Sequence, residues 1–388
     1  MIYLDNAATT RVAPEVLDAM LPYLRESYGN PGAVYSLGRE AKAAVDRARE
    51  QVASFMGCSP ENVIFTSGGS EGNNLVIRGL ETELRKRGRM NVVISKIEHD
   101  SVVKAADALC IKDGFYLSKV CPTPAGEIET DAVVKTIKQS TGLVSVMMAN
   151  NETGILNDTR DICFAAQESG ALFHTDAVQA AGCVPLRADS DGYDFMTISS
   201  HKIHGPKGVG AIYASRPELL SPLICGGDEQ EFGFRGGTEN VAGIVGFGKA
   251  CELAEENLEA NSCRMRIVRE IFLKDLRGAF ASFCGDGEHF LVNGSGKNTN
   301  KVLNLRFDGV DAQSLLLMLD ARGICVSAGS ACRSHESRPS RVLTAMGLSG
   351  EEAHSSIRVS FSEDTSAEDV RNAAVTTAAC VDFLRKMH

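Results

Sequence analysis

Two patterns of apolar and polar positions alternate over the first two thirds of the chain. Short apolar runs bounded by Gly, Asn, Ser or charged residues are typical of buried strands, whereas apolar residues spaced three and four apart are typical of amphipathic helices. Their alternation predicts an α/β fold, with a mostly parallel sheet flanked by helices on both faces. Strands are expected at residues 62–66, 91–95, 115–120, 143–149, 171–175, 194–198 and 209–214, and helices at 14–25, 37–56, 70–87, 101–112, 131–139 and 158–169.

The pattern changes near residue 240. We expect a large domain over residues 14–254 and a smaller α+β domain over residues 255–388. Residues 1–13 are expected to join the smaller domain, because the regular pattern begins only at residue 14. The C-terminal part shows one long helical stretch at 240–277, strands at 302–307, 323–326 and 357–361, and helices at 312–321, 340–346 and 367–386.

Composition narrows the class of protein. The 388 residues carry a net charge of -10 and no basic tract, which argues against a nucleic-acid partner or an anionic membrane. The longest apolar runs are far shorter than the roughly 20 residues of a membrane span, and the first residues do not resemble a secretory signal. The chain has 12 cysteines but no Cys-x-x-Cys pair, so we expect a cytoplasmic protein with reduced thiols.

The most informative stretch is SSHKIHGPKG, which follows an apolar segment that is typical of a buried strand. It places Lys202 at the strand end among hydroxyl and imidazole groups, where a solvated surface lysine is a poor explanation. Such an amine can form a Schiff base with a carbonyl cofactor while flanking polar groups hold an anion. His201 and His204 lack a Cys, His or carboxylate cluster at ligand spacing, so no metal site is predicted. The stretch predicts a pyridoxal-phosphate enzyme.

The run SGGSEGNN follows an apolar strand and begins a helix. Glycines let the main chain approach an anion, and a helix N-terminus offers free N–H groups. Ser70 is suited both to cap the helix and to contact a phosphate. A capped turn without a ligand explains the run equally well, and the run matches neither a Walker nor a Rossmann motif.

Three polar residues follow predicted strands. Asp176 lies at the carboxyl end of a strand, where α/β proteins bind ligands, and its carboxylate can pair with a protonated pyridine nitrogen. Gln179 follows it, with an amide able to reach the phenolate of the same ring. His99 can stack on an aromatic cofactor and carry protons. A helix cap for Asp176 and an ordinary loop histidine for His99 are the competing interpretations.

Three later positions complete the candidates. Asn151 is part of a turn and carries an amide that can donate to the cofactor or hold the substrate. Arg358 lies in an apolar strand and needs a partner, which can be a substrate carboxylate or an internal salt bridge. Cys332 lies in the run SAGSACRSH, whose small residues predict an exposed loop. The basic neighbours Arg333 and His335 favour a reactive thiolate there.

Taken together, these residues resemble the cysteine desulfurases of the NifS/IscS type, in the aminotransferase class-V branch of the fold-type I pyridoxal-phosphate enzymes. The lysine context and the Ser-Ala-Gly-Ser-Ala-Cys run separate this family from its aminotransferase relatives. The chain departs from the family pattern at residues 32–35 and at Arg333. The matching segments are 3–10, 29–31, 67–74, 98–99, 150–154, 176–179, 200–208, 235–238 and 327–332.

The resemblance implies a pyridoxal 5'-phosphate site and a set of roles. Lys202 forms the Schiff base, and Cys332 is the nucleophile that takes the substrate sulfur as a persulfide. Phosphate contacts come from Gly69, Ser70, Ser199 and His201, with Thr238 supplied by the second subunit of a homodimer. Asp176 pairs with the pyridine nitrogen, Gln179 and Asn151 bear on the phenolate, His99 stacks on the ring, and Arg358, Asn30 and Asn151 bind the substrate carboxylate.

The implied reaction converts L-cysteine to L-alanine and passes the sulfur to an acceptor protein, in iron–sulfur cluster assembly or tRNA thiolation. Two alternatives stay open. A selenocysteine lyase or another alanine-producing enzyme on the same scaffold need not use a protein thiol in this way. A desulfurase-like binding module without catalysis is also compatible with the fold, although such a protein is expected to have lost Lys202 or Cys332.

Overall fold

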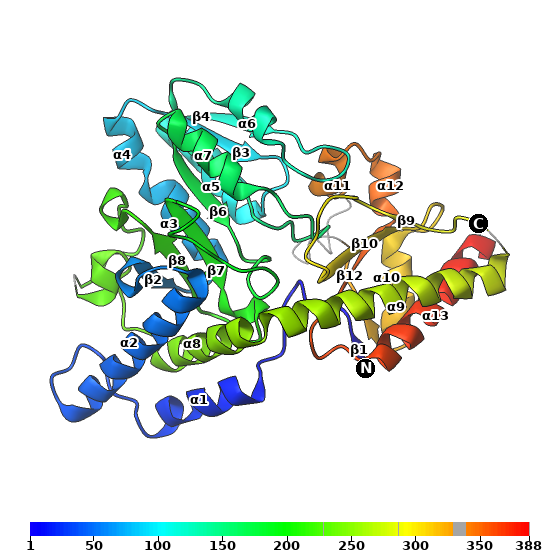
Figure 1. The fold of residues 1–388 in the computed structure, drawn as a ribbon, viewed down its shortest axis with the longest axis horizontal. Helices are drawn as coiled ribbons and strands as arrows, with labels where there is room; N and C mark the ends of the chain where they lie inside the picture. Colours follow the sequence, from blue (N-terminus) through cyan, green and yellow to red (C-terminus); the bar gives the residue numbers. More distant parts are fainter. Residues whose placement is uncertain (228, 286, 329–338, 388) are drawn as a thin grey trace.

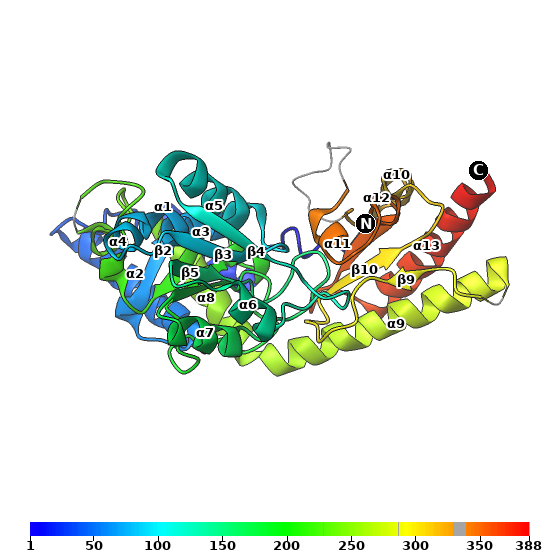
Figure 2. The same cartoon turned by 90° about the horizontal axis from the view of Figure 1, so that it is seen from above.

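The computed structural model describes residues 1–227, 229–285, 287–328 and 339–387. The molecule is elongated, with a large sheet and its helices at one end and the later elements of the chain at the other (Figures 1 and 2). Helix α9 (Leu258–Cys284) runs along the second part in both views. No helix of the described chain has the length and apolar character needed to cross a bilayer.

A seven-stranded sheet of the described chain has the order β2-β8-β7-β6-β5-β3-β4. Strand β8 is antiparallel to both of its neighbours, and the remaining pairs are parallel. The predicted α/β class with a mostly parallel sheet is therefore confirmed. The strands are β2 (Val63–Thr66), β3 (Asn91–Ser95), β4 (Tyr116–Val120), β5 (Thr141–Ser145), β6 (Leu172–Asp176), β7 (Phe195–Ser199) and β8 (Gly210–Ala214).

Helices cover this sheet on both faces, and each face has its own apolar cluster. One cluster includes residues of α1 (Pro14–Arg25), α2 (Ser36–Met56), α6 (Thr130–Thr136), α7 (Thr159–Glu168) and α8 (Val241–Glu256). The other includes residues of α3 (Gly69–Gly79), α4 (Glu81–Lys86) and α5 (Asp100–Asp113). Burial on both faces explains why the strands are near-continuous apolar runs rather than alternating ones.

The second part of the molecule has a separate core. Its antiparallel sheet has the order β12-β10-β9, and helices α9, α10 and α13 contribute to the same apolar cluster. The N-terminal strand β1 (Ile2–Tyr3) pairs in parallel with β11 (Ile324–Cys325), so Leu4 is buried in this core as well. The elements are β9 (Leu291–Val292), β10 (Val302–Arg306), β12 (Ser356–Ser360), α10 (Ala312–Asp320) and α13 (Ala367–Met387).

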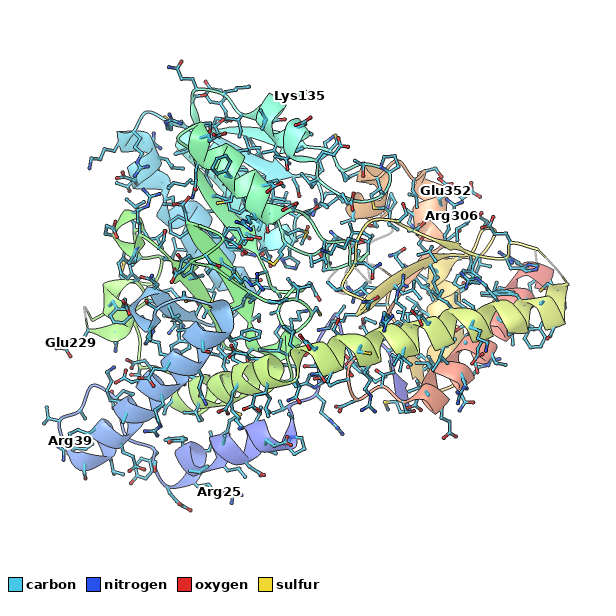
Figure 3. The ribbon with its side chains drawn as sticks, in the orientation of Figure 1. Arg25, Arg39, Lys135, Glu229, Arg306 and Glu352 are labelled. Carbon is cyan, nitrogen blue, oxygen red and sulfur yellow. The ribbon has the colours of Figure 1, made fainter. Side chains whose placement is uncertain are left out.

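Two short helices join the two parts. Apolar residues of α11 (Arg341–Ala345) and α12 (Gly350–His354) belong to a cluster of the large sheet rather than to the second core. Arg306 of β10 forms an ion pair with Glu352 of α12 at 2.5 Å, and their side chains lie next to each other in Figure 3. The domain division at residues 254 and 255 stays a prediction.

Several elements begin or end at other residues than predicted, because of local interactions. The helix expected at 70–87 is divided because the Gly79 carbonyl accepts from Ser221 N at 2.8 Å. The stretch 240–277 holds two helices, since the Asn257 side chain donates to the Leu253 carbonyl and competes with helix continuation. Strand β5 ends at Ser145, before the expected boundary at 149. Short elements that the pattern did not indicate are β1, β9 and α12.

Candidate active site

A pocket of about 430 Å³ opens at the carboxyl ends of the parallel strands, between them and the N-terminal segment. This is where α/β proteins bind ligands. Ten of the residues predicted from the sequence line it: Gly69, Ser70, His99, Asn151, Asp176, Gln179, Ser199, His201, Lys202 and Arg358. They come from segments dispersed over most of the chain, so the fold gathers them.

Lys202 lies in a single 3-10 turn (Ser200–Lys202) directly after β7. Its Nζ donates to the carbonyl oxygens of Ala7 and Ala8, each at 2.7 Å. Burial, together with the positive charges of Lys301 and Arg358, lowers the pKa of Lys202 to about 7. The amine is therefore partly neutral at physiological pH, which is the form that acts as a nucleophile.

Asp176 ends β6 and is almost fully buried. Its Oδ2 accepts from Asn73 Nδ2 at 2.7 Å, and its Oδ1 accepts from Val178 N at 3.0 Å. Asn73 comes from α3 on the neighbouring side of the pocket and is also buried. The two donors fix the carboxylate at the pocket wall. The alternative interpretation of Asp176 is a helix cap, but no helix of the described chain begins directly after it.

His99 is the N-cap of α5 and lines the pocket. Its Nδ1 accepts from Ser101 N at 3.2 Å, so the neutral ring carries its proton on Nε2. The preceding residue, Glu98, is buried, and its Oε1 accepts from Met147 N at 2.9 Å. Burial and the nearby Asp176 charge raise the pKa of Glu98 to about 8, so this carboxyl group is mostly protonated at neutral pH.

The first turn of α3 has the features of an anion-binding site. Gly68 precedes it with φ 145°, a conformation that favours glycine, and no side chain of the described residues caps the helix. Ser70 lies in this turn and lines the pocket. Ser199 Oγ is buried without a hydrogen-bond partner among the described residues. His201 is held by Thr9 Oγ1 at 3.1 Å, and burial with nearby lysine charges lowers its pKa to about 4.

Arg358 lies on β12 and is 2% exposed. It pairs with Asp5 at 2.8 Å and donates to the Asn151 carbonyl at 2.8 Å. The internal salt bridge considered from the sequence is therefore present. Arg358 and Gln179 both line the pocket, and the Nε of Arg358 and the Oε1 of Gln179 are buried without a partner among the described residues. The Gln179 amide nitrogen donates to Ala7 O at 2.8 Å.

Cys332 lies outside the described residues. The chain on both sides of it is attached to the pocket walls. Ser327 exchanges main-chain hydrogen bonds with Arg358. On the C-terminal side, Arg341 donates to the carbonyl oxygens of Lys96 and Glu98, in the segment directly before His99.

The comparisons with known proteins agree with this geometry. The profile of the aminotransferase class-V family matches residues 2–372. A putative cysteine desulfurase IscS 1 of Bacillus subtilis is 41% identical, over 99% of each chain. The chain belongs to the aminotransferase class-V family, and within it to the NifS/IscS-type cysteine desulfurases. A solved NifS-like protein superposes with TM-score 0.90 at 32% identity, covering 98% of this chain and 99% of that one. SspA in complex with cysteine gives TM-score 0.78 at 32% identity, covering 93% and 99%.

Pyridoxal 5'-phosphate is the cofactor of the class-V family, and the pocket fits it. The uncapped α3 N-terminus and the unpartnered Ser199 hydroxyl suit a phosphate. Asp176 suits a pyridine nitrogen, and the unpartnered polar atom of Gln179 suits the ring substituents. Lys202 offers a partly neutral amine. The donor set therefore matches each polar end of the cofactor.

Two predicted residues of this class-V chain lie outside the pocket. Asn30 accepts from Gly32 N at 2.9 Å in an exposed turn, and Thr238 is exposed on a segment after β8. Asn73 and Lys301 were not singled out from the sequence, although both touch predicted site residues. The position of Asn73 one turn into α3, next to the Gly-rich run, is a signal that could have found it. Among the described residues, no group of three or more His, Cys, Asp or Glu could hold a metal ion.

Proposed function

We propose that this protein is a pyridoxal-phosphate-dependent L-cysteine desulfurase, which converts L-cysteine to L-alanine and leaves the sulfur on Cys332. The observation that carries the proposal is one pocket that gathers Lys202, Asp176 and Arg358 around an uncapped helix N-terminus. The relatives named cysteine desulfurase and the cysteine-bound SspA support the choice of substrate.

The cofactor, when bound, supplies an electron sink that weakens bonds at the α-carbon of an amino acid. The chain's contribution begins with Asp176, whose carboxylate would hold a proton on the pyridine nitrogen. Asn73 and Val178 N keep that carboxylate in place through hydrogen bonds of 2.7 and 3.0 Å. Ser70, Ser199 and the neutral His201 would hold the phosphate as hydrogen-bond donors, with Gly69 in the same helix turn.

Lys202 and His99 would move protons. The Lys202 amine, with its pKa lowered to about 7, can both take up and return a proton near neutral pH. His99 keeps Nδ1 as the acceptor of its helix-cap bond and so presents Nε2 to the ligand. Because His99 lines the pocket, its ring is also available to stack on a cofactor.

Arg358 would bind the carboxylate of the substrate. Asp5 and the Asn151 carbonyl already occupy its two terminal nitrogens, which fixes the plane of the guanidinium. The Nε–H, which has no partner among the described residues, is one of the remaining N–H donors that a carboxylate can use. The Asn151 side chain lines the same pocket and is a second donor.

Cys332 would attack the substrate sulfur as a thiolate, forming an S–S bond as the C–S bond of the substrate breaks. Its position in the chain supports this role, because Ser327 and Arg341 attach the flanking chain to the Arg358 and His99 sides of the pocket. An acceptor protein would then take the sulfur, in iron–sulfur cluster assembly or tRNA thiolation.

Two variants test the proposal. The purified protein is expected to be coloured, and the band should be absent from Lys202→Ala. Cys332→Ala should keep the band but lose sulfide release from L-cysteine in the presence of a reductant. A colourless wild type that gains no band on adding pyridoxal phosphate contradicts the cofactor assignment. Full sulfide release by Cys332→Ala contradicts the persulfide route.

We further propose a cytoplasmic homodimer in which Thr238 reaches the partner's phosphate site. Glu231 anchors the segment before Thr238 through a buried pair with Arg49, at 2.6 and 2.9 Å. Arg235 joins it to Glu71 in the first turn of α3 at 3.0 Å. The described cysteines are free thiols, as a reducing compartment allows. Glu231 also accepts from Phe65 N of β2, the edge strand of the large sheet, and Glu229 of the same segment lies at this outer side of the sheet (Figure 3).

Subunit mixing tests the dimer. Lys202→Ala and Thr238→Ala dimers should each be impaired, because one lacks the amine and the other lacks the phosphate contact from its partner. A mixed dimer has one site with both residues intact, so mixing should restore part of the activity. Sedimentation as a single 41.5 kDa chain at working concentration contradicts the dimer.

A further inference from the structure

A second lysine is attached to the main chain of Lys202. Lys301 lies directly before β10, in the other part of the molecule, and only 5% of it is exposed. Its Nζ donates to the Lys202 carbonyl oxygen at 2.8 Å. An ammonium group is rarely buried without a specific partner, because removing its charge from water is costly. The contact therefore calls for an explanation.

Lys301 and Lys202 both line a second cavity, of about 430 Å³, which shares only Lys202 with the lining of the active-site pocket. Three carboxylates line this cavity, Glu15, Asp364 and Glu363. Asp364 pairs with Arg11 at 3.5 Å, and Glu363 is shared between His204, whose Nε2 lies 3.2 Å from its Oε2, and the charge of Lys301. Although burial opposes it, His204 and Lys301 lower the pKa of Glu363, which keeps this group ionised. The positive charge of Lys301 is thus only partly balanced.

The charges that face Lys202 come from four other segments of the chain. Lys301 and Arg358 disfavour a positive charge on its amine, and Asp5 and Asp176 favour one. Both carboxylates have partners of their own, Arg358 for Asp5 and Asn73 for Asp176. Burial and the two cations outweigh the two anions, so the pKa of the Lys202 amine falls from 10.5 to about 7.

We propose that Lys301 is a positioning residue for Lys202, which fixes the lysine's main chain and places a buried positive charge behind its amine. The inference rests on the proposed function, because it concerns the amine that would bind the cofactor. A neutral amine adds through its lone pair to the aldehyde carbon of pyridoxal phosphate, and the aldehyde oxygen leaves as water. Lys301 increases the fraction of Lys202 that can start this step near neutral pH.

The test uses the full-length, cofactor-free protein. Pyridoxal phosphate is added, and the rate of appearance of the visible band is measured across the pH range for wild type and three variants. Lys301→Gln removes the charge but keeps an amide donor, and Lys301→Arg keeps the charge. Lys297→Gln, an exposed lysine on the same loop, is the matched control.

We expect the midpoint of the wild-type, Lys297→Gln and Lys301→Arg profiles near pH 7. The midpoint of Lys301→Gln should rise by about one unit, so its rate near neutral pH falls about tenfold. An unshifted Lys301→Gln profile overturns the inference, as does a rate that falls equally at every pH. A wild type that forms no band overturns the proposed function and this inference together, whereas a band without a shift overturns the inference alone.

A second variant keeps the test available if Lys301→Gln does not fold. Glu363→Gln removes the carboxylate that partly balances Lys301, so the midpoint should move in the opposite direction, below that of wild type. Glu363 does not line the active-site pocket, so its loss does not remove a predicted cofactor contact. A midpoint that stays in place or rises in Glu363→Gln contradicts the proposed role of Lys301.

Discussion

The pair between Asp5 and Arg358 offers a prediction that separates stability from substrate binding. Arg358 is 2% exposed at its side chain and Asp5 is 18% exposed, with 2.8 Å between Nη2 and Oδ1. Asp5→Asn keeps the shape and a hydrogen-bond acceptor but removes the only carboxylate paired with Arg358 among the described residues. A buried cation is then balanced only by neutral acceptors, which costs about 3 kcal/mol, the low end for a buried pair because Asp5 is partly exposed.

Urea-induced unfolding of the cofactor-free protein measures this cost as a lower midpoint with an unchanged slope. The matched control is Asp364→Asn, which breaks an exposed pair with Arg11, with side chains 56% and 78% exposed. The control should lose about 0.5 kcal/mol or less. The KM for L-cysteine should not rise in Asp5→Asn, because Arg358 is retained and less neutralised. Equal unfolding free energies for Asp5→Asn and wild type would refute the assigned role of the pair.

Three further predictions concern other buried groups. Asn73→Leu removes a donor to Asp176 and should weaken cofactor affinity about tenfold in equilibrium dialysis; unchanged affinity contradicts this. Glu231→Gln leaves Arg49 unpaired, so the thermal midpoint should fall by several degrees, and an unchanged midpoint counts against it. Folding raises the pKa of Glu98 from 4.5 to about 8. The contribution of Glu98 to the free energy of unfolding therefore falls as pH rises through this window. In denaturant titrations, the free energy of unfolding of Glu98→Gln should rise relative to that of wild type between about pH 5 and 8. A difference in unfolding free energy between Glu98→Gln and wild type that is the same at every pH refutes this.

Much of the site could be predicted because its residues follow apolar strands. Asp176 and Lys202 each come directly after or at the end of a buried strand, and parallel strands bring their carboxyl ends to one edge of the sheet. Ser70 lies in a Gly-rich turn that begins a helix, which is a local pattern as well. Strand periodicity and turn composition therefore identified most of the residues that line the pocket, without knowledge of tertiary contacts.

The partners of these residues could not be predicted, because they depend on packing between distant segments. Asp5 and Arg358 are 353 residues apart in the sequence, and Lys301 is 99 residues from Lys202. Neither pair has a local pattern that joins its members. The break at Asn257 was equally hidden, because it depends on one side chain bonding its own helix rather than on apolar periodicity.

One measurement tests the central claim most directly. The purified, cofactor-loaded protein is incubated with L-cysteine in the absence of reductant, and both alanine and the mass of the peptide that contains Cys332 are measured. The account predicts about one alanine per chain in the first turnover and one added sulfur atom on Cys332, with neither product in Lys202→Ala. Alanine formation without added sulfur on Cys332, or no alanine from a fully loaded protein, would contradict it.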